Sequence, residues 1–251
     1  MPEEKMHFKD YRSGMLTNGI ERAAHRALLY STGLDREDLG KPMIAVVNSF
    51  TEMVPGHFHL RELADFVKQG IIEAGGIPRE FSTIAICDGL CQGHCGMRYP
   101  LPSRDLIADS IEMVVQAHHF DAMVLIPGCD KIIPGMLMAA ARLNLPAVMV
   151  VGGPMPGGAV FDGRKSDQTS IDEALGMLQV GKIGAEDVLN LENTACPGCG
   201  SCSYLGTANT MCALAEALGM TLPDGGTAPA TSAVRMMKAE ETGVKIMELV
   251  E

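Results

Sequence analysis

Four short apolar runs recur along the chain before residue 153. Each is rich in valine, isoleucine, alanine and methionine, and none shows strict alternation of apolar and polar positions. Runs of this kind are typical of parallel strands that are covered on both faces. The predicted strands are Met43–Asn48, Thr83–Cys87, Ala122–Ile126 and Ala147–Gly152.

Helical patterns separate these runs. Phe58–Gly76 has apolar residues at helical spacing and ends in a Gly-Gly pair, which commonly stops a helix. Ser103 is the expected N-cap of a helix that runs through His119, and Ile132–Asn144 carries a proline in its first turn. Strands alternating with helices at this pace predict an α/β domain whose mainly parallel sheet is flanked by helices.

The C-terminal third shows helical patterns and no clear strand. The segment Gly152–Gln168 is rich in glycine and proline and is expected to be an open loop. The last helical pattern reaches Glu251 without a stop signal, so residues 1–251 are expected to be one part cut from a longer protein. The predicted helices span residues 170–178, 184–191, 207–220 and 232–251.

Composition and charge narrow the function classes. The 251 residues carry a net charge of -11, and this acidic balance argues against nucleic acid, which is bound by basic patches. No apolar stretch approaches the roughly 20 residues that a membrane span needs. The N-terminus has no apolar signal segment, so we expect a cytoplasmic protein. Eight cysteines in that setting indicate a metal or redox site rather than disulfides.

Chemically unlike side chains follow two of the predicted strands. Asp88 comes directly after the second strand, and Cys129, Asp130 and Lys131 come after the third. Ligands of parallel sheets bind beyond the carboxyl ends of the strands, so these residues are expected at one crevice. The carboxylates suit Mg²⁺, and the thiolate suits an iron–sulfur cluster or zinc. Taken singly, each has a plain alternative: a helix cap, a solvated charge and a small buried core residue.

A second cysteine cluster lies near residue 200. Cys196, Cys199 and Cys202 form a CxxCxxC pattern among glycines, a spacing typical of soft-metal binding. The spacing does not separate zinc from an iron–sulfur cluster. Cys87 is expected in the core of the sheet, and Cys91 is left without a role.

These motifs together resemble the dihydroxy-acid dehydratase family, which also includes sugar-acid dehydratases such as 6-phosphogluconate dehydratase. The most specific segments are CDKIIPGMLMAAARLN, VNSFTEMVPGHFHL, DGLCQGHCGMRYPLPSRDLIADSIE and ACPGCGSCSYLGTANTM. The segments PGHFHL and LPSRDLIADS are more similar to the branched-chain dihydroxy-acid enzymes than to the sugar-acid enzymes.

The resemblance implies a role for the thiol, carboxylate and amine side chains that follow the predicted strands, and for one cysteine of the CxxCxxC pattern. Cys129 and Cys202 match cysteines that bind an iron–sulfur cluster in the family. Asp88 and Asp130 match ligands of Mg²⁺, as does Lys131, which would bind as a carbamate. Carbamylation would turn an amine into an anionic oxygen donor.

The resemblance also bears on the type of cluster. Relatives with a two-iron cluster carry a third cysteine at the position of Gly56, where this chain has glycine. Cys199 is present where those relatives tend to have alanine. We therefore expect a 4Fe-4S rather than a 2Fe-2S cluster, with Cys199 as its third thiolate and Cys196 as the alternative.

The reaction implied is dehydration of 2,3-dihydroxy carboxylic acids to 2-oxo acids, in the biosynthesis of isoleucine and valine. A sugar-acid dehydratase, and an inactive fragment or zinc-stabilised module, are the alternatives. The family's second, β-rich domain, which would provide the catalytic base, is expected outside these residues, so the isolated chain is expected to be incomplete. Family members pair as homodimers. Tyr204 and Gly206 depart from the usual family pattern and leave the substrate open.

Overall fold

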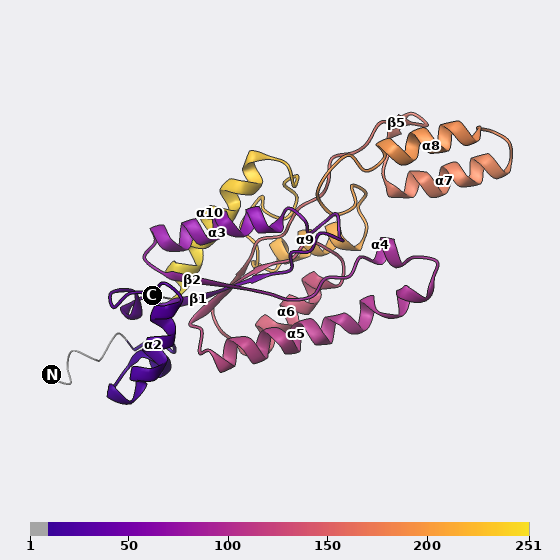
Figure 1. Ribbon diagram of the computed structural model, residues 1–251. Helices are drawn as coiled ribbons and strands as arrows, with labels where there is room; N and C mark the ends of the chain where they lie inside the picture. The colour runs from indigo at the N-terminus through magenta and orange to yellow at the C-terminus, as the bar shows by residue number, and fades with distance from the viewer. Residues whose placement is uncertain (1–9, 251) are drawn as a thin grey trace.

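The computed structural model describes residues 10–250 and centres on a four-stranded parallel sheet (Figure 1). The strand order is β2-β1-β3-β4, so the direction of winding reverses between β1 and β3. Such a reversal opens a crevice at the carboxyl ends of the two strands. The predicted α/β fold with a parallel sheet is confirmed. The strands are β1 (Met43–Asn48), β2 (Ile77–Ser82), β3 (Ala122–Ile126) and β4 (Ala147–Met149).

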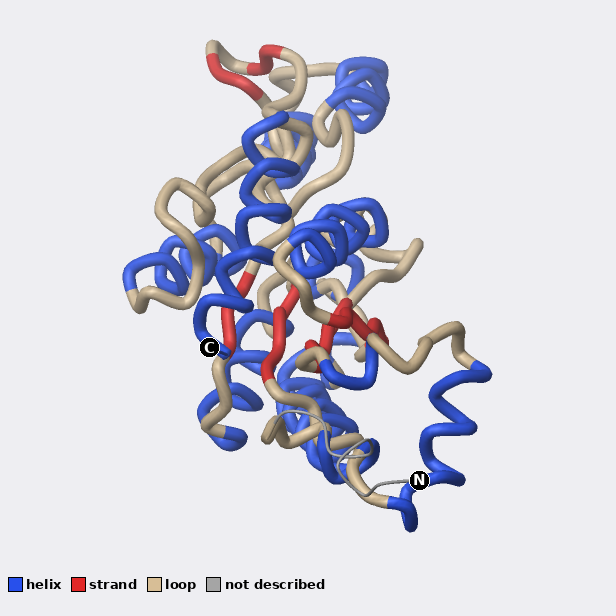
Figure 2. The backbone as a smooth tube through the Cα atoms, turned by 90° about the vertical axis from the view of Figure 1, so that its left-hand side faces the viewer, coloured by secondary structure: helices blue, strands red, loops and turns tan. Residues whose placement is uncertain are grey.

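Helices cover both faces of the sheet (Figure 2). The odd-numbered residues of β1 pack with α5 (Pro100–Ala117) and α6 (Ile132–Leu143). Its even-numbered residues pack with α3 (Leu60–Glu73) and α10 (Ala233–Val250). Because both faces are dry, β1 and β3 are apolar at nearly every position, which is why their bounds were predicted correctly.

Two glycines let α3 and α10 cross at close range. A Cβ atom on Gly70 would collide with the carbonyl oxygen of Glu240, and one on Gly243 would collide with that of Val67. The helix backbones therefore meet directly. The end of α3 also agrees with its predicted stop, because the amides of Gly75 and Gly76 bond back to the last turn.

The second predicted strand was wrong. The strand is β2, whereas residues 83–87 form a loop after it. β2 lies at the edge of the sheet and is half exposed, so its sequence IPREFS is polar and contains a proline that an edge strand tolerates. The loop looks apolar in sequence because Ala85 and Cys87 pack against the core.

Three smaller expectations also needed correction. Helix α5 begins at Pro100, and Ser103 lies inside its first turn with the hydroxyl donating to the Pro100 carbonyl. β4 ends at Met149, three residues earlier than expected. The expected open loop contains a hairpin of β5 (Val160–Phe161) and β6 (Arg164–Lys165). Its turn residues Asp162 and Gly163 both have positive φ, as a tight hairpin turn requires.

The remaining elements are helical. Helices α7 (Gln168–Gln179) and α8 (Ala185–Thr194) pack on each other beside the hairpin and form a small lobe away from the sheet (Figure 1). Within residues 10–250 no helix combines the length and apolar character that crossing a membrane requires. The other helices are α1 (Gly14–Thr17), η2 (Ile20–Arg22), α2 (Ala23–Ser31), η3 (Asp38–Gly40), α4 (Asp88–Cys91), η4 (Cys95–Arg98) and α9 (Thr207–Ala217).

Candidate functional site

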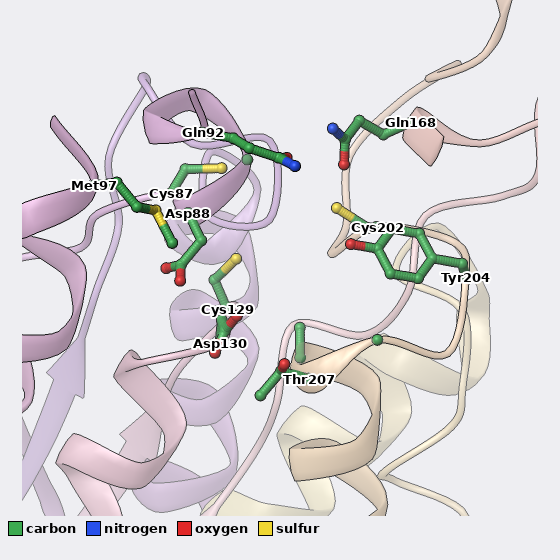
Figure 3. Close-up of a pocket in the computed structure, with 13 residues that line it drawn as sticks. Cys87, Asp88, Gln92, Met97, Cys129, Asp130, Gln168, Cys202, Tyr204 and Thr207 are labelled. Carbon is green, nitrogen blue, oxygen red and sulfur yellow. The ribbon is translucent and has the colours of Figure 1, made fainter. Parts of the chain in front are cut away.

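A cavity of about 270 Å³ opens beyond the carboxyl ends of the strands. It is formed by three segments that are distant in sequence: residues 87–97 in and around α4, the β3–α6 turn, and the stretch from Cys202 into α9. Gln168 at the start of α7 completes the wall (Figure 3). The cavity lies where the reversal of strand order predicts a binding site.

The β3–α6 turn fixes Cys129, Asp130 and Lys131 in space. The carbonyl oxygen of Cys129 accepts hydrogen bonds from the amides of Ile132 and Ile133, both at 3.2 Å. These bonds hold the turn at the first residues of α6. The three side chains are therefore displayed at the helix N-terminus, where the helix dipole favours negative charge.

Lys131 joins the two carboxylates that were expected to meet. Its Nζ lies 2.8 Å from Asp88 Oδ2 and 2.7 Å from Asp130 Oδ1. Burial lowers the pKa of Lys131, but hydrogen bonds and charges of Asp130 and Asp88 outweigh that effect and leave the pKa raised. The ammonium thus provides the positive charge between two carboxylates.

One oxygen of this group has no partner. Asp88 Oδ1 is buried and makes no hydrogen bond to the protein. A buried carboxylate oxygen without a donor is costly unless a cation or another donor reaches it. Among residues 10–250, no three histidine, cysteine, aspartate or glutamate side chains converge closely enough to hold one metal ion directly.

Thiols gather on the same cavity. Cys87, Cys129 and Cys202 all line it, and the sulfur atoms of all three are turned toward the space between the loops (Figure 3). A hydrogen bond with Cys129 lowers the pKa of Cys87 to about 6. The same contact and burial raise the pKa of Cys129, and burial raises that of Cys202.

The CxxCxxC motif divides between two places. Cys196 joins Cys87, Cys129 and Cys202 around an adjoining cavity of about 190 Å³. Cys199 instead lines a different cavity, beside residues of α3 and α10. The structure therefore brings together two of the three predicted cluster cysteines and leaves Cys199 apart. Its role as the third thiolate stays a prediction.

Asn209 positions the Cys202 loop from the first turn of α9. Its Oδ1 accepts from the Ser201 hydroxyl at 2.6 Å, and its Nδ2 donates to the carbonyl oxygens of Cys202 and Tyr204, each at 2.8 Å. Three hydrogen bonds from one side chain thus hold the loop that carries the thiol.

The sequence did not predict several residues that line the cavity. Cys87 was expected in the sheet core, although it stands directly before Asp88 in the same way that Cys129 stands before Asp130. That repeated Cys-Asp pair was the available signal. Gln92, Gln168 and Thr207 also line the wall, and nothing in their local sequence marks them.

Known proteins match the chain along most of its length. The family model described as the N-terminal part of dihydroxy-acid/6-phosphogluconate dehydratases matches residues 41–251. The chain belongs to this family. Proteins named dihydroxy-acid dehydratase from Pyrococcus abyssi and Pyrococcus furiosus are each 56% identical to it over 240 residues. One from Caldanaerobacter subterraneus subsp. tengcongensis is 55% identical over the same length.

The alignments cover 96% of this chain but only 43% of each of these relatives. The chain therefore spans less than half the length of the dehydratases it matches. Membership of the family leaves the activity of the whole protein to be proposed from the site.

Proposed function

We propose that this chain supplies the iron–sulfur and Mg²⁺ sites of a dihydroxy-acid dehydratase. The reaction would be the dehydration of 2,3-dihydroxy carboxylic acids, of the 2,3-dihydroxy-isovalerate type, to 2-oxo acids in isoleucine and valine biosynthesis. The names of the relatives support this assignment. The observation that carries it is the meeting of soft donors, Cys129 and Cys202, with hard donors, Asp88 and Asp130, on one cavity.

Cys129 and Cys202 would hold the cluster, for which we favour the 4Fe-4S type. They approach from opposite sides of the cavity, so a group larger than one ion could bind between them (Figure 3). Thiolates are the usual ligands of iron–sulfur clusters. For the third thiolate the family resemblance of the sequence predicts Cys199.

Asp88, Asp130 and a carbamate on Lys131 would hold Mg²⁺. The unpartnered Asp88 Oδ1 fits a cation, because carboxylate oxygens are the ligands that Mg²⁺ prefers. Carbamylation joins the neutral Lys131 amine to CO₂ and releases a proton. Two carboxylates favour the ammonium instead, so we expect the carbamate and the divalent cation to appear together.

The cavity offers further groups to a dihydroxy acid. When bound, the two metal groups would supply Lewis acidity, iron toward the C3 hydroxyl and Mg²⁺ toward the carboxylate and C2 hydroxyl. The N-terminus of α9 faces the cavity through Gly206 and Thr207, and its backbone amides favour a carboxylate. Gln92 and Gln168 offer amide groups to hydroxyls. We assign no base to this chain.

Anaerobic purification of the complete protein tests the proposal. We expect iron and acid-labile sulfide in the purified protein, a visible absorption spectrum, and loss of activity in air. A colourless protein that holds zinc and no sulfide would support the zinc-stabilised module instead.

A sugar-acid dehydratase is the second candidate, because the matching family includes 6-phosphogluconate dehydratases. Parallel assays of the complete protein with a branched-chain dihydroxy acid and with aldonates would separate the two. Turnover confined to aldonates would overturn the first assignment. We also propose that the complete protein is cytoplasmic and forms a homodimer. Sedimentation of the complete protein would check the homodimer.

A further inference from the structure

Three thiols, carried by three separate loops, face one space. Cys87 comes from the loop after β2, Cys129 from the β3–α6 turn, and Cys202 from the segment before α9. All three line both the main cavity and the adjoining one. Cys87 and Cys129 lie on the same side of the main cavity, across from Cys202 (Figure 3). Cys87 therefore already stands with the two cysteines assigned to the cluster.

The position of Cys199 is different. It lines a cavity with His59 and Arg235 and borders neither of the cavities that hold the other thiols. The backbone beside it is fixed, since the amide of Gly200 donates to the Pro55 carbonyl and that of Ser201 to the Gly153 carbonyl, both at 3.0 Å. These bonds hold the segment after Cys199 against two other loops, with Cys199 on its separate cavity.

The local sequence repeats around the site. Cys87-Asp88 and Cys129-Asp130 each place a thiol directly before a carboxylate. The two carboxylates meet at Lys131, and the two thiols line the same two cavities. Each Cys-Asp pair therefore brings one soft donor and one hard donor to the cavity. Two loops of the sheet contribute to both sites in the same order.

We propose that Cys87, rather than Cys199, is the third thiolate ligand of the iron–sulfur cluster. The assignment rests on the proposed function, since it presumes that a cluster binds here. Thiolates from three loops would leave one iron of a four-iron cluster open to substrate. Cys196 is the weaker candidate, because it is exposed and borders only the adjoining cavity.

Cysteine-to-serine variants of the complete protein, prepared anaerobically, test this inference. The set is Cys87→Ser, Cys199→Ser and Cys196→Ser, with Cys91→Ser as a matched control four residues after Cys87, at the end of α4. The readouts are iron and sulfide per chain, the electron paramagnetic resonance spectrum of the reduced protein, and the rate of iron release to a chelator. Thermal unfolding of each metal-free variant checks the fold, and Cys87→Ala provides a second replacement at the same position.

We expect Cys87→Ser either to lack the cluster or to release iron at least about tenfold faster than the wild type. Losing a partner that merely orients a metal ligand commonly weakens binding about 10–100-fold, so losing a direct ligand should cost no less. The other three variants should match the wild type in iron, sulfide and spectrum.

The inference is overturned if both Cys87 variants keep the wild-type iron, spectrum and release rate, and more plainly so if Cys199→Ser or Cys196→Ser loses them. A wild-type protein without iron and sulfide would instead overturn the proposed function, and this assignment with it. The two failures are therefore distinguishable, and neither depends on measuring activity.

Discussion

Gly128 touches Gly56 backbone to backbone, so that a Cβ atom on Gly128 would collide with the carbonyl oxygen of Gly56. This contact joins the loop after β1 to the turn that carries Cys129. Because the contact is between backbone atoms of the two loops, neither loop can yield as the end of a flexible side chain could. The absence of a side chain at Gly128 therefore lets the turn that carries Cys129 lie directly against the loop after β1.

Gly128→Ala is expected to destabilise the protein by about 3 kcal/mol, since forcing extra volume into a packed region shifts backbone. Urea unfolding of the metal-free protein would measure the loss. Gly176→Ala is the matched control, because Gly176 lies in α7 with open space around its Cα. There the change should stabilise by about 0.5–1 kcal/mol. Equal effects at the two positions would contradict the close contact.

Asn209→Ala is expected to loosen the Cys202 loop. The variant loses three hydrogen bonds and leaves the partly buried carbonyls of Cys202 and Tyr204 without their donor. A cost of about 2 kcal/mol follows from the usual penalty for unsatisfied groups. Urea unfolding measures it, and faster exchange of the loop amides with solvent should accompany it.

The control for Asn209 is Asn193→Ala in α8. Asn193 is exposed and makes a single hydrogen bond, to the Leu189 carbonyl at 2.9 Å. Its replacement should change stability by less than about 0.5 kcal/mol, as is usual for surface positions. If loop exchange is unchanged in Asn209→Ala, then other contacts hold the loop.

Because of Lys131, the affinity of the protein for Mg²⁺ should depend on bicarbonate. In the wild type, the affinity for Mg²⁺ should rise when bicarbonate is added, because a carbamate would replace a cation by an anionic ligand between Asp88 and Asp130. In Lys131→Met, bicarbonate should have no effect. Isothermal titration calorimetry of the complete protein with Mg²⁺, with and without bicarbonate, measures both.

Lys41→Met controls for loss of a positive charge elsewhere. Lys41 pairs with Asp38 at 2.8 Å near the N-terminus of β1, far along the chain from the cavity. The bicarbonate effect should persist in this variant. If bicarbonate leaves the affinity of the wild type for Mg²⁺ unchanged, a carbamate at Lys131 is ruled out.

Sequence patterns predicted the fold where burial is complete and failed where it is partial. β1 and β3 are dry on both faces, so their residues are apolar throughout and their bounds were predicted correctly. β2 is an edge strand with a solvated face, and the apolar loop after it was mistaken for a strand.

The site follows the same division. Asp130 and Lys131 follow the end of β3, and their meeting with Asp88 was predicted because parallel strands present their carboxyl ends at one edge. Asp88 reaches that edge although the strand predicted directly before it is a loop, residues 83–87, that follows β2. The separation of Cys199 from Cys202 could not be foreseen. It depends on how the backbone of Gly200 and Ser201 bonds to two other loops, which no spacing rule encodes.

His57 makes stability depend on pH. It is fully buried, and its Nδ1 donates to the Ser49 carbonyl at 2.8 Å while Nε2 has no partner. Burial lowers the pKa of His57 to about 4, although the hydrogen bond to Ser49 partly opposes this. In the unfolded chain, residue His57 therefore binds a proton below about pH 6.5, whereas in the folded protein it binds one only below about pH 4. Stability contributed by neutral His57 is present above that window and is lost as the pH falls through it.

The loss attributable to His57 should approach about 3 kcal/mol by pH 4, because a pKa that is lower by one in the folded protein than in the unfolded chain corresponds to about 1.4 kcal/mol. Urea unfolding of the metal-free protein at several pH values between about 7 and about 4 would measure it. In His57→Asn, an amide can still donate to the Ser49 carbonyl but does not titrate, so the slope should be shallower. His118→Asn, at an exposed position after α5, should keep the wild-type slope. An unchanged slope in His57→Asn would show that other groups carry the dependence, such as His59, whose pKa burial also lowers.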